Sequence, residues 1–246
     1  MKVLAIDTAN QGLGVALVED GKVIGNYLGM ASKNHSVTLM PAIDFVMKAN
    51  KWSPKELDRI VVAKGPGSYT GLRIGVTTAK TLAWTLGIDL VGVSSLAAVA
   101  SNSKGYEGLI VPLFDARRLN VYTGAYKWVK GELEIIIEDR HSSLESWLDC
   151  LVTQYSDETI RFVGTDAVLF EEMIKEKLPK AEFVLAGGVN EVNASSLALL
   201  GQGMEPVTSI EDFVPVYLKK VEAEEKWLEK NEETGSNYVE KITYTS

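Results

Sequence analysis

The residues of this sequence that could do chemistry include an acidic side chain that ends a strand. Asp7 and Thr8 follow the β-rich run that begins at Lys2, so we expect them where a strand meets a polar turn. A carboxylate there, followed by a glycine hairpin, could orient a magnesium ion beside a phosphate tail, because hard cations prefer oxygen ligands. The more common use of such a residue is an Asx turn, in which Asp7 only caps the turn.

A glycine-rich turn, GPGSYTG, is the second candidate. It precedes a helix that we expect from about Leu72 to Leu86, whose free amide groups and positive dipole end suit an anion. It is not a phosphate-binding P-loop, because the Lys-Ser/Thr pair is missing. The glycines could equally serve close packing of a strand on a helix. The turn residues that could line an anion site are Gly65, Gly67, Ser68, Thr70 and Gly71.

Few residues of this sequence could form a metal site or a disulfide. The chain has one cysteine, Cys150, and two histidines, His35 and His141. A single cysteine excludes an intramolecular disulfide and a zinc site built from cysteines, and two histidines exclude a His-rich centre. His35 lies just before an expected helix, where capping or an interface hydrogen bond is a more common role than metal binding.

Composition favours an ordinary globular protein. The 246 residues are 46% hydrophobic and 24% charged, with 25 Lys and Arg against 33 Asp and Glu, for a net charge of -8. That balance argues against direct binding of nucleic acid, which usually needs a basic face. No apolar run approaches the roughly 20 residues of a membrane span, and Asp7 comes too early for a signal peptide. We therefore expect a cytoplasmic protein without a membrane segment.

The elements that must position these residues occur in the order βββαβαβα, and this order occurs twice. Each copy begins with a strand that ends in an aspartate, Asp7 in the first and Asp115 in the second. We predict an α/β protein of two subdomains, residues 1–104 and 105–220, followed by a charged tail at 221–246. The alternative is one mixed α/β domain whose element order repeats by chance.

Two N-terminal helices carry more apolar surface than one packing face requires. On the expected helix from His35 to Lys48, one arc includes Leu39 and Ile43, and a second includes Val37 and Phe45. Two arcs indicate burial on both sides. On the next long helix Trp84 shares a face with two cations, which is typical of an interface hot spot, although its ring could also pack on a neighbouring loop. The predicted interface residues are His35, Val37, Met40, Pro41, Phe45, Arg73, Lys80 and Trp84.

Several segments together resemble the TsaB (YeaZ) family. They are AIDTAN near the start, residues 62–100 from VAKGPGSYTGLRIG onward, DARRLNVYTGAY at 115–126 and DFVPVYLKKVEAEEKW at 212–227. The resemblance implies a duplicated actin/Hsp70/sugar-kinase-like (ASKHA) fold. It also implies a non-catalytic subunit of the machinery that installs threonylcarbamoyl on the adenosine next to the tRNA anticodon. The implied partners are a homologous, metal-bearing TsaD-type subunit, bound through the two N-terminal helices, and through the complex a TsaE-type ATPase. Alone, such a protein would form a homodimer through the same two helices, and it would meet tRNA only indirectly.

The resemblance also implies that the chain lacks a catalytic centre. The catalytic relative carries two metal-binding histidines four residues apart, and here those positions are Ser95 and Val99. We therefore expect no catalytic residue, no metal and no cofactor of its own. Gly187 and Gly188 resemble the turn that contacts adenosine in ATP-binding members of the superfold, or form a plain loop. Together with Asp7, Thr8 and the 65–71 turn they could form a degenerate nucleotide pocket, with weak or absent ATP and ADP binding.

Two enzymatic alternatives compete with this interpretation. An ATP-dependent phosphotransferase of the sugar-kinase superfold would need a carboxylate base near the phosphates. Asp115 is the obvious candidate, but Arg117 and Arg118 would more naturally pair with it or with an acidic group of a partner. A metallopeptidase is disfavoured by the missing histidines.

Overall fold

The computed structural model describes residues 1–30, 34–184, 190–191 and 193–219. Its N-terminal half contains β1 (Lys2–Asp7), β2 (Gly12–Glu19), β3 (Lys22–Met30), α1 (His35–Ala49), β4 (Arg59–Gly65), α2 (Tyr69–Leu86), β5 (Asp89–Ser94) and α3 (Ser95–Ser101). The C-terminal half contains β6 (Leu109–Asp115), β7 (Asn120–Val129), β8 (Glu132–Ser143), α4 (Leu144–Tyr155), β9 (Ile160–Val163), α5 (Glu171–Lys177), β10 (Glu182–Phe183) and α6 (Ala194–Gln202). Two 3₁₀ turns, η1 (Pro54–Glu56) and η2 (Ala167–Phe170), complete the described elements.

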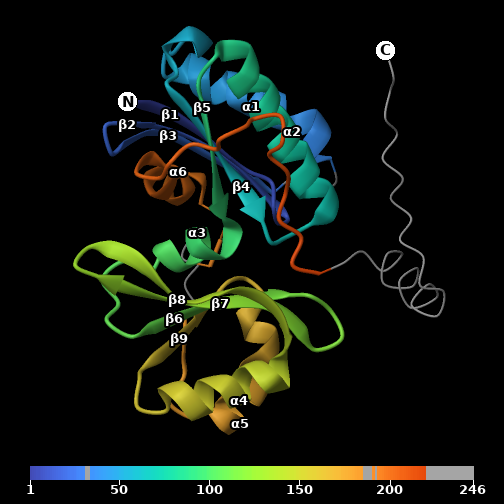
Figure 1. Ribbon diagram of the computed structural model, residues 1–246, viewed down its shortest axis with the longest axis vertical. Helices are drawn as coiled ribbons and strands as arrows, with labels where there is room; N and C mark the ends of the chain where they lie inside the picture. Colours follow the sequence, from blue (N-terminus) through green and yellow to red (C-terminus); the bar gives the residue numbers. More distant parts are fainter. Residues whose placement is uncertain (31–33, 185–189, 192, 220–246) are drawn as a thin grey trace, which may run out of the picture.

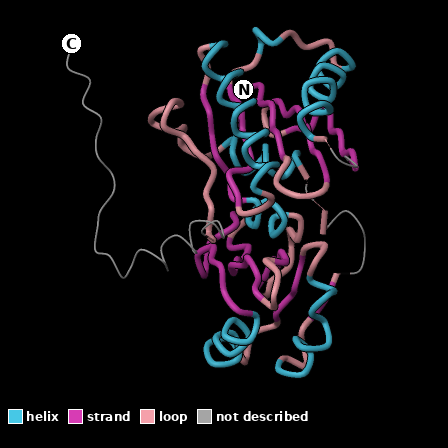
Figure 2. The backbone as a smooth tube through the Cα atoms, turned by 90° about the vertical axis from the view of Figure 1, so that its right-hand side faces the viewer, coloured by secondary structure: helices cyan, strands magenta, loops and turns pink. Residues whose placement is uncertain are grey.

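The two halves share one topology, which confirms the predicted duplication. Their five-stranded sheets have the orders β3-β2-β1-β4-β5 and β8-β7-β6-β9-β10, so each strand has its counterpart at the same place. In both sheets the first three strands pair antiparallel and the last two join in parallel. Figures 1 and 2 show the halves stacked along the long axis of the molecule, with α1 and α2 on the N-terminal sheet and α4 and α5 at the opposite end.

Element boundaries differ from the prediction at a few places. The capping-box sequence at Ser53–Glu56 predicts a short helix. The structure has only the 3₁₀ turn η1 there, because the chain enters β4 at Arg59 and leaves no room for a longer helix. The sequence pattern predicts one helix over 167–178, whereas the structure divides this segment into η2 and α5. The long helix α2 begins at Tyr69, three residues before the predicted start, because the Ser68 hydroxyl accepts from the Gly71 amide as its N-cap.

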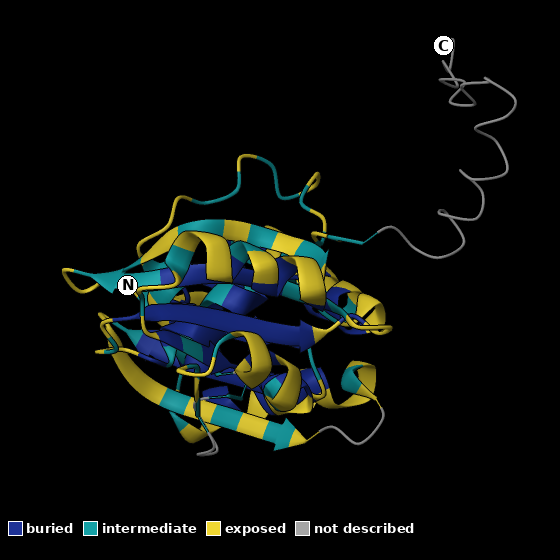
Figure 3. Ribbon diagram, turned by 90° about the horizontal axis from the view of Figure 1, so that it is seen from below, coloured by how far each residue is buried: buried dark blue, intermediate teal, exposed yellow. Residues whose placement is uncertain are grey.

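Packing does not follow the predicted division into residues 1–104 and 105–220. The last helix of each half packs against the other half's sheet or core. Helix α6 buries Ala194, Leu197 and Ala198 against β1 and β2, while α3 places Leu96 and Val99 beside strands of the C-terminal sheet. Helices therefore cover both faces of β1 and β2, so these strands are buried on both sides (Figure 3). Because both faces are covered, β2 is buried at consecutive positions from Gly12 to Val18 and not only at alternate ones.

Residues 205–219, here named the C-terminal strap, return from α6 along the N-terminal half. The Val207 amide donates to the Leu90 carbonyl of β5 at 2.9 Å. The Lys80 ammonium on α2 donates to the carbonyls of Glu211 and Phe213 at 2.7 and 2.8 Å. The Phe213 ring lies against Gly92, where a Cβ would come within 2.4 Å of it. The strap thus covers the β5 edge of the sheet.

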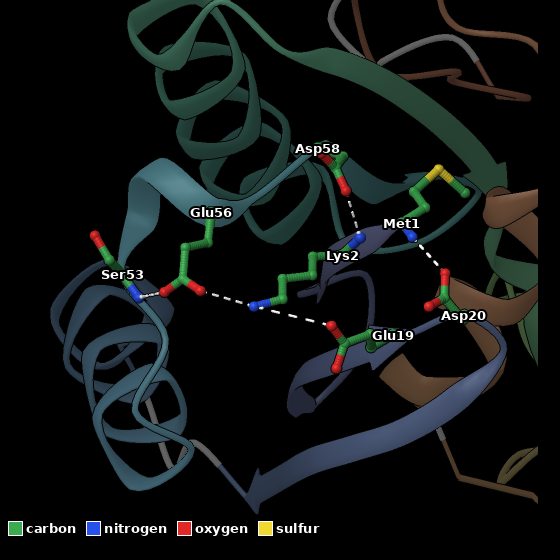
Figure 4. Close-up of polar contacts among 7 residues, drawn as sticks. All are labelled: Met1, Lys2, Glu19, Asp20, Ser53, Glu56 and Asp58. Atoms are coloured by element: carbon green, nitrogen blue, oxygen red, sulfur yellow. Dashed lines mark hydrogen bonds and ion pairs between the residues drawn. The ribbon is translucent and has the colours of Figure 1, made fainter.

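A polar cluster holds the start of β1 (Figure 4). The Met1 amino group lies 2.5 Å from the Asp20 carboxylate, and the Lys2 ammonium lies 2.7 Å from that of Glu56. Glu56 also accepts from the Ser53 amide, which completes the capping box of η1. These ion pairs are largely exposed, so each contributes little stability. No helix among the described residues is long and apolar enough to span a membrane.

Candidate functional site

Asp7 is buried at the end of β1, with 1% of its surface exposed. One carboxylate oxygen accepts from the Ala9 amide at 2.9 Å, as in an Asx turn. The other oxygen is buried and has no hydrogen-bond partner. Loss of hydration raises the pKa of Asp7 to about 7, although the Ala9 amide opposes this shift. Around neutral pH this carboxyl is therefore only partly ionised.

The glycine turn packs directly on the residues that follow Asp7. The Ser68 amide donates to the Ala9 carbonyl at 2.7 Å, and the Thr8 hydroxyl donates to the Gly71 carbonyl at 2.7 Å. A Cβ on Gly67 would lie 2.3 Å from the Ala9 carbonyl oxygen, and one on Gly71 would lie 2.1 Å from that of Thr8. These glycines allow the N-terminus of α2 to approach β1, which is the packing alternative of the sequence analysis.

These residues do not fit a magnesium–nucleotide complex of the kind that the superfold implies. A metal-orienting carboxylate must be accessible, whereas Asp7 is buried and one of its oxygens already accepts from the Ala9 amide. Of the predicted pocket residues, Gly67 and Ser68 line an open cavity of about 280 Å³ between the halves, and Thr70 is exposed. Gly65 is buried, and Gly187 and Gly188 lie outside the described residues. The structure thus brings only part of the predicted pocket to one place.

Asp115 lines the same cavity from the other half, as the candidate base of the phosphotransferase alternative. Its carboxylate accepts from the backbone amide of Arg117 at 2.8 Å, and its own amide donates to Asp166 at 2.8 Å. Asp115 therefore pairs with the backbone amide of Arg117 and not, as the sequence had predicted, with an arginine guanidinium. The carboxylate serves a turn in which Arg117, Arg118 and Leu119 have φ values of 67°, 54° and 55°.

The state of Asp7 leads to a prediction about stability and pH. The folded protein holds the Asp7 proton up to about pH 7, whereas the unfolded chain releases it near pH 4. The free energy of unfolding of the wild type therefore falls as the pH rises from about 4 to about 7. Above pH 7 the loss reaches roughly 4 kcal/mol. Asp7→Asn keeps the acceptor for the Ala9 amide and does not titrate. Urea unfolding should show the variant gaining stability over the wild type between pH 4 and pH 8, and a pH-independent difference would contradict the assignment.

Helices α1 and α2 carry an exposed apolar surface, here named the α1–α2 face and defined by Val37, Met40, Pro41, Phe45 and Trp84. The opposite side of α1 is buried through Leu39, Ala42, Ile43, Val46 and Met47. Val37, Phe45 and Trp84 are 65%, 62% and 69% exposed, and Met40, a predicted interface residue, is also exposed. The two-arc interpretation of α1 thus separates a core side from an exposed side.

The remaining predicted interface residues make contacts within the chain. The His35 ring nitrogen Nε2 lies 3.0 Å from the Asn10 carbonyl oxygen, so His35 connects α1 to the β1–β2 turn. Lys80 is engaged by the C-terminal strap. Arg73 donates to the Tyr69 hydroxyl at 2.6 Å, and the Tyr69 ring stacks on Tyr217 of the strap. His35 and Lys80 are therefore tethering residues in this structure, and Arg73 borders the exposed face.

A buried polar link between the halves has no counterpart in the sequence analysis. The Asp139 carboxylate on β8 accepts from the Ser94 hydroxyl at the end of β5 at 2.5 Å, and also from the Tyr126 hydroxyl on β7. Burial raises the pKa of Asp139, while both hydroxyls oppose that rise. No sequence signal marks this link, because Asp139 stands between the charged residues Glu138 and Arg140.

Ser95 and Val99 lie on α3 and are each 1% exposed. Val99 packs in the core beside the C-terminal sheet, and the Ser95 hydroxyl is buried without a partner. Within the described part of the chain, no three side chains of His, Cys, Asp or Glu are grouped as they would be to hold a metal ion.

The two halves have identical topology, a cavity lies between them, and their final helices are exchanged. These features define the actin-like and sugar-kinase class of fold. In agreement, a hexokinase of the ROK type from Thermus thermophilus aligns over 82% of this chain and 98% of its own, with a TM-score of 0.50 and 9% identity. YeaZ from Pseudomonas aeruginosa aligns over 88% of this chain and 99% of its own, with a TM-score of 0.74 and 23% identity. These likenesses establish the fold.

The family follows from sequence. The chain is 44% identical over 229 residues to the tRNA threonylcarbamoyladenosine biosynthesis protein TsaB of Bacillus subtilis, covering 93% of this chain and 99% of that protein. The family model described as TsaD, tRNA N6-adenosine threonylcarbamoyltransferase, matches residues 29–227. The chain belongs to the TsaB (YeaZ) family, as the sequence resemblance predicted.

Proposed function

We propose that this chain acts in tRNA threonylcarbamoyladenosine biosynthesis as a non-catalytic subunit that binds a homologous TsaD-type subunit through the α1–α2 face. The name of the Bacillus subtilis relative supports the pathway. The match to the TsaD family model supports common descent with the catalytic subunit. The proposal further includes a homodimer when the protein is alone, contact with a TsaE-type ATPase through the complex, and only indirect contact with tRNA.

The exposed α1–α2 face is the observation that carries this proposal. Its large apolar side chains, Val37, Phe45 and Trp84, point away from a core that α1 and α2 already complete on their inner sides. Large apolar side chains exposed on neighbouring helices are typical of a surface that binds another protein. Trp is the residue type most enriched at interface hot spots. Another pair of helices is the simplest partner, because side chains of two exposed helix faces can interdigitate.

Three features support the proposal that this chain catalyses no reaction. Ser95 and Val99 stand buried where the catalytic relative carries its metal ligands. Asp7 is buried and one of its oxygens accepts from the Ala9 amide, so it is poorly suited to hold magnesium. The Asp115 carboxylate accepts from the Arg117 backbone amide of its own turn. We propose that the protein has no cofactor of its own and binds ATP or ADP weakly or not at all.

The experiment that tests the proposal is reconstitution with the TsaD-type subunit of the same organism. Size-exclusion chromatography with light scattering should show a complex of the two chains at micromolar concentration. Two separately eluting proteins at all tested concentrations would contradict the proposed function.

Lack of turnover is a further prediction. The purified protein should hydrolyse neither ATP nor peptides above the rate of a buffer control, with or without magnesium or zinc. Calorimetric titration with ATP should give no heat of tight binding. Metal-dependent turnover that co-purifies with the protein, and that Asp115→Asn abolishes, would favour the phosphotransferase alternative instead.

A further inference from the structure

The turn between β6 and β7 presents two neighbouring cations, Arg117 and Arg118, to the solvent. Both are exposed, and Leu119 beside them is 56% exposed. Within the described part of the chain, neither guanidinium group makes an ion pair or a hydrogen bond. Each of the other arginines has a partner for its guanidinium group: Arg59 donates to Asp89, Arg73 to Tyr69, Arg140 to Glu138 and Arg161 to Glu182. We name residues 117–119 the arginine turn.

The backbone of the arginine turn is held by its own contacts. The Asp115 carboxylate accepts from the Arg117 amide at 2.8 Å. The Asn120 side-chain amide donates to the carbonyls of Arg117 and Arg118, both at 3.1 Å. The turn therefore needs neither guanidinium group for its own structure, and both groups are left to bind an anion.

The described chain ends close to the arginine turn. Lys219, the last residue before the tail, lines a hollow of about 190 Å³ together with Gly67 and Tyr122. Gly67 and Tyr122 also line the cavity between the halves, to which Arg117 contributes. Figure 1 shows the described chain ending on the side of the molecule where β6 and β7 join. The next residues of the chain thus start within reach of the two arginines.

The sequence that follows Lys219 is complementary to the arginine turn. Glu222, Glu224 and Glu225 supply three carboxylates within four positions, and Trp227 follows two positions later. The six residues from 220 to 225 can span about 20 Å when extended. We name residues 222–227 the acidic segment. Its carboxylates match the two guanidinium groups in charge, and its indole ring matches the exposed Leu119 in polarity.

We propose that the acidic segment docks on the arginine turn, where its carboxylates pair with Arg117 and Arg118 and Trp227 covers Leu119. Guanidinium and carboxylate groups form charge-assisted, often bidentate, hydrogen bonds. Exposed ion pairs are individually weak. The covalent tether compensates for this, because it holds the segment at an effective concentration on the order of millimolar.

The acidic segment binds the outer side of the turn and not the cavity beneath it. Asp115 and Asp166 line that cavity, so its interior repels further carboxylates. A docked segment shields two arginines that would otherwise attract phosphate groups of a nucleic acid. The inference stands independently of the α1–α2 face, because the arginine turn belongs to the C-terminal half.

The first test locates the tail in the full chain by NMR. In a Cys150→Ala background, Ala223→Cys carries a nitroxide label. At low salt the backbone amide signals of Arg117, Arg118 and Leu119 should be lost to paramagnetic broadening, whereas exposed Lys180, beyond α5, should keep its signal. In about 1 M salt, where charges are screened beyond about 3 Å, the lost signals should return. Signals of the turn that persist at low salt would overturn the proposal.

The second test exchanges the charges of the two sides. Arg117→Glu with Arg118→Glu should bring back the signals of the turn, and further addition of Glu222→Lys, Glu224→Lys and Glu225→Lys should remove them again. A misfolded variant could not produce this rescue. Lys130→Glu is the matched control, because Lys130 is exposed in the β7–β8 turn with a φ of 51°, and it should leave the broadening unchanged.

Two results would contradict the pairing. Broadening of the turn that survives Arg117→Glu with Arg118→Glu would show that other contacts hold the tail there. Binding of single-stranded RNA by the unlabelled full chain at low salt, abolished by the same double variant, would assign the arginine turn to nucleic acid instead.

Discussion

Replacement of Trp84 by Glu is expected to abolish binding of the TsaD-type subunit at micromolar concentrations while leaving the fold intact. Trp84 is 69% exposed on α2, so its removal takes little from the core. In a complex the ring would be buried, and a carboxylate in its place would be stranded in an apolar contact at a cost of about 3 kcal/mol or more. That corresponds to a loss of affinity of at least 100-fold. Phe45→Asp should act in the same way.

The matched control is Leu169→Glu, which adds a charge at a similarly exposed apolar position on η2. It should bind the partner like the wild type. Calorimetric binding and thermal unfolding are measured for Trp84→Glu, Phe45→Asp and Leu169→Glu, and together they test this prediction. If Trp84→Glu lowered the melting temperature strongly and left binding intact, Trp84 would belong to the folding core and the interface would lie elsewhere.

Replacement of Gly71 by Ala is expected to destabilise the protein by about 3 kcal/mol or more, although alanine is the better helix former. The new Cβ would lie 2.1 Å from the Thr8 carbonyl oxygen, and backbone at that contact cannot move without breaking β1. The Thr8 hydroxyl also donates to the Gly71 carbonyl at 2.7 Å, so the same shift disturbs a buried hydrogen bond. A decrease in melting temperature of roughly 6–12 °C follows for a chain of this size.

Gly203→Ala provides the comparison, because a Cβ at Gly203 would meet no atom within 4 Å. That variant should unfold within about 1 °C of the wild type. Equal melting temperatures for both variants would show that the 65–71 turn is not closed against β1, and would reopen the case for a ligand at this place.

Short-range patterns predicted most of the fold. The apolar runs that end at Asp7 and Asp115 gave the first strand of each half, and the two arcs of α1 separated Leu39 and Ile43 in the core from exposed Val37 and Phe45. Features that depend on contacts between distant segments were not predictable. The exchange of α3 and α6 is one example, because no local pattern indicates which sheet a helix will cover.

The candidate site shows the same limit. The sequence could not decide whether the glycines at 67 and 71 serve an anion or close packing, because both uses require a backbone without Cβ atoms. In the structure the Ser68 amide donates to the Ala9 carbonyl, so the turn does pack closely on the end of β1. Likewise, Lys80 was grouped with Trp84 by helical spacing, whereas its ammonium holds the carbonyls of Glu211 and Phe213, more than 100 residues away in the chain.

The most direct test of the proposed function is the content of threonylcarbamoyladenosine in tRNA from cells depleted of this protein, measured by mass spectrometry of the nucleosides. The account predicts that the modified nucleoside disappears, that the wild-type chain restores it, and that Trp84→Glu does not restore it although the variant is folded and present. Formation of threonylcarbamoyl-adenylate should continue in the depleted cells. A normal content of threonylcarbamoyladenosine without this protein would contradict the account.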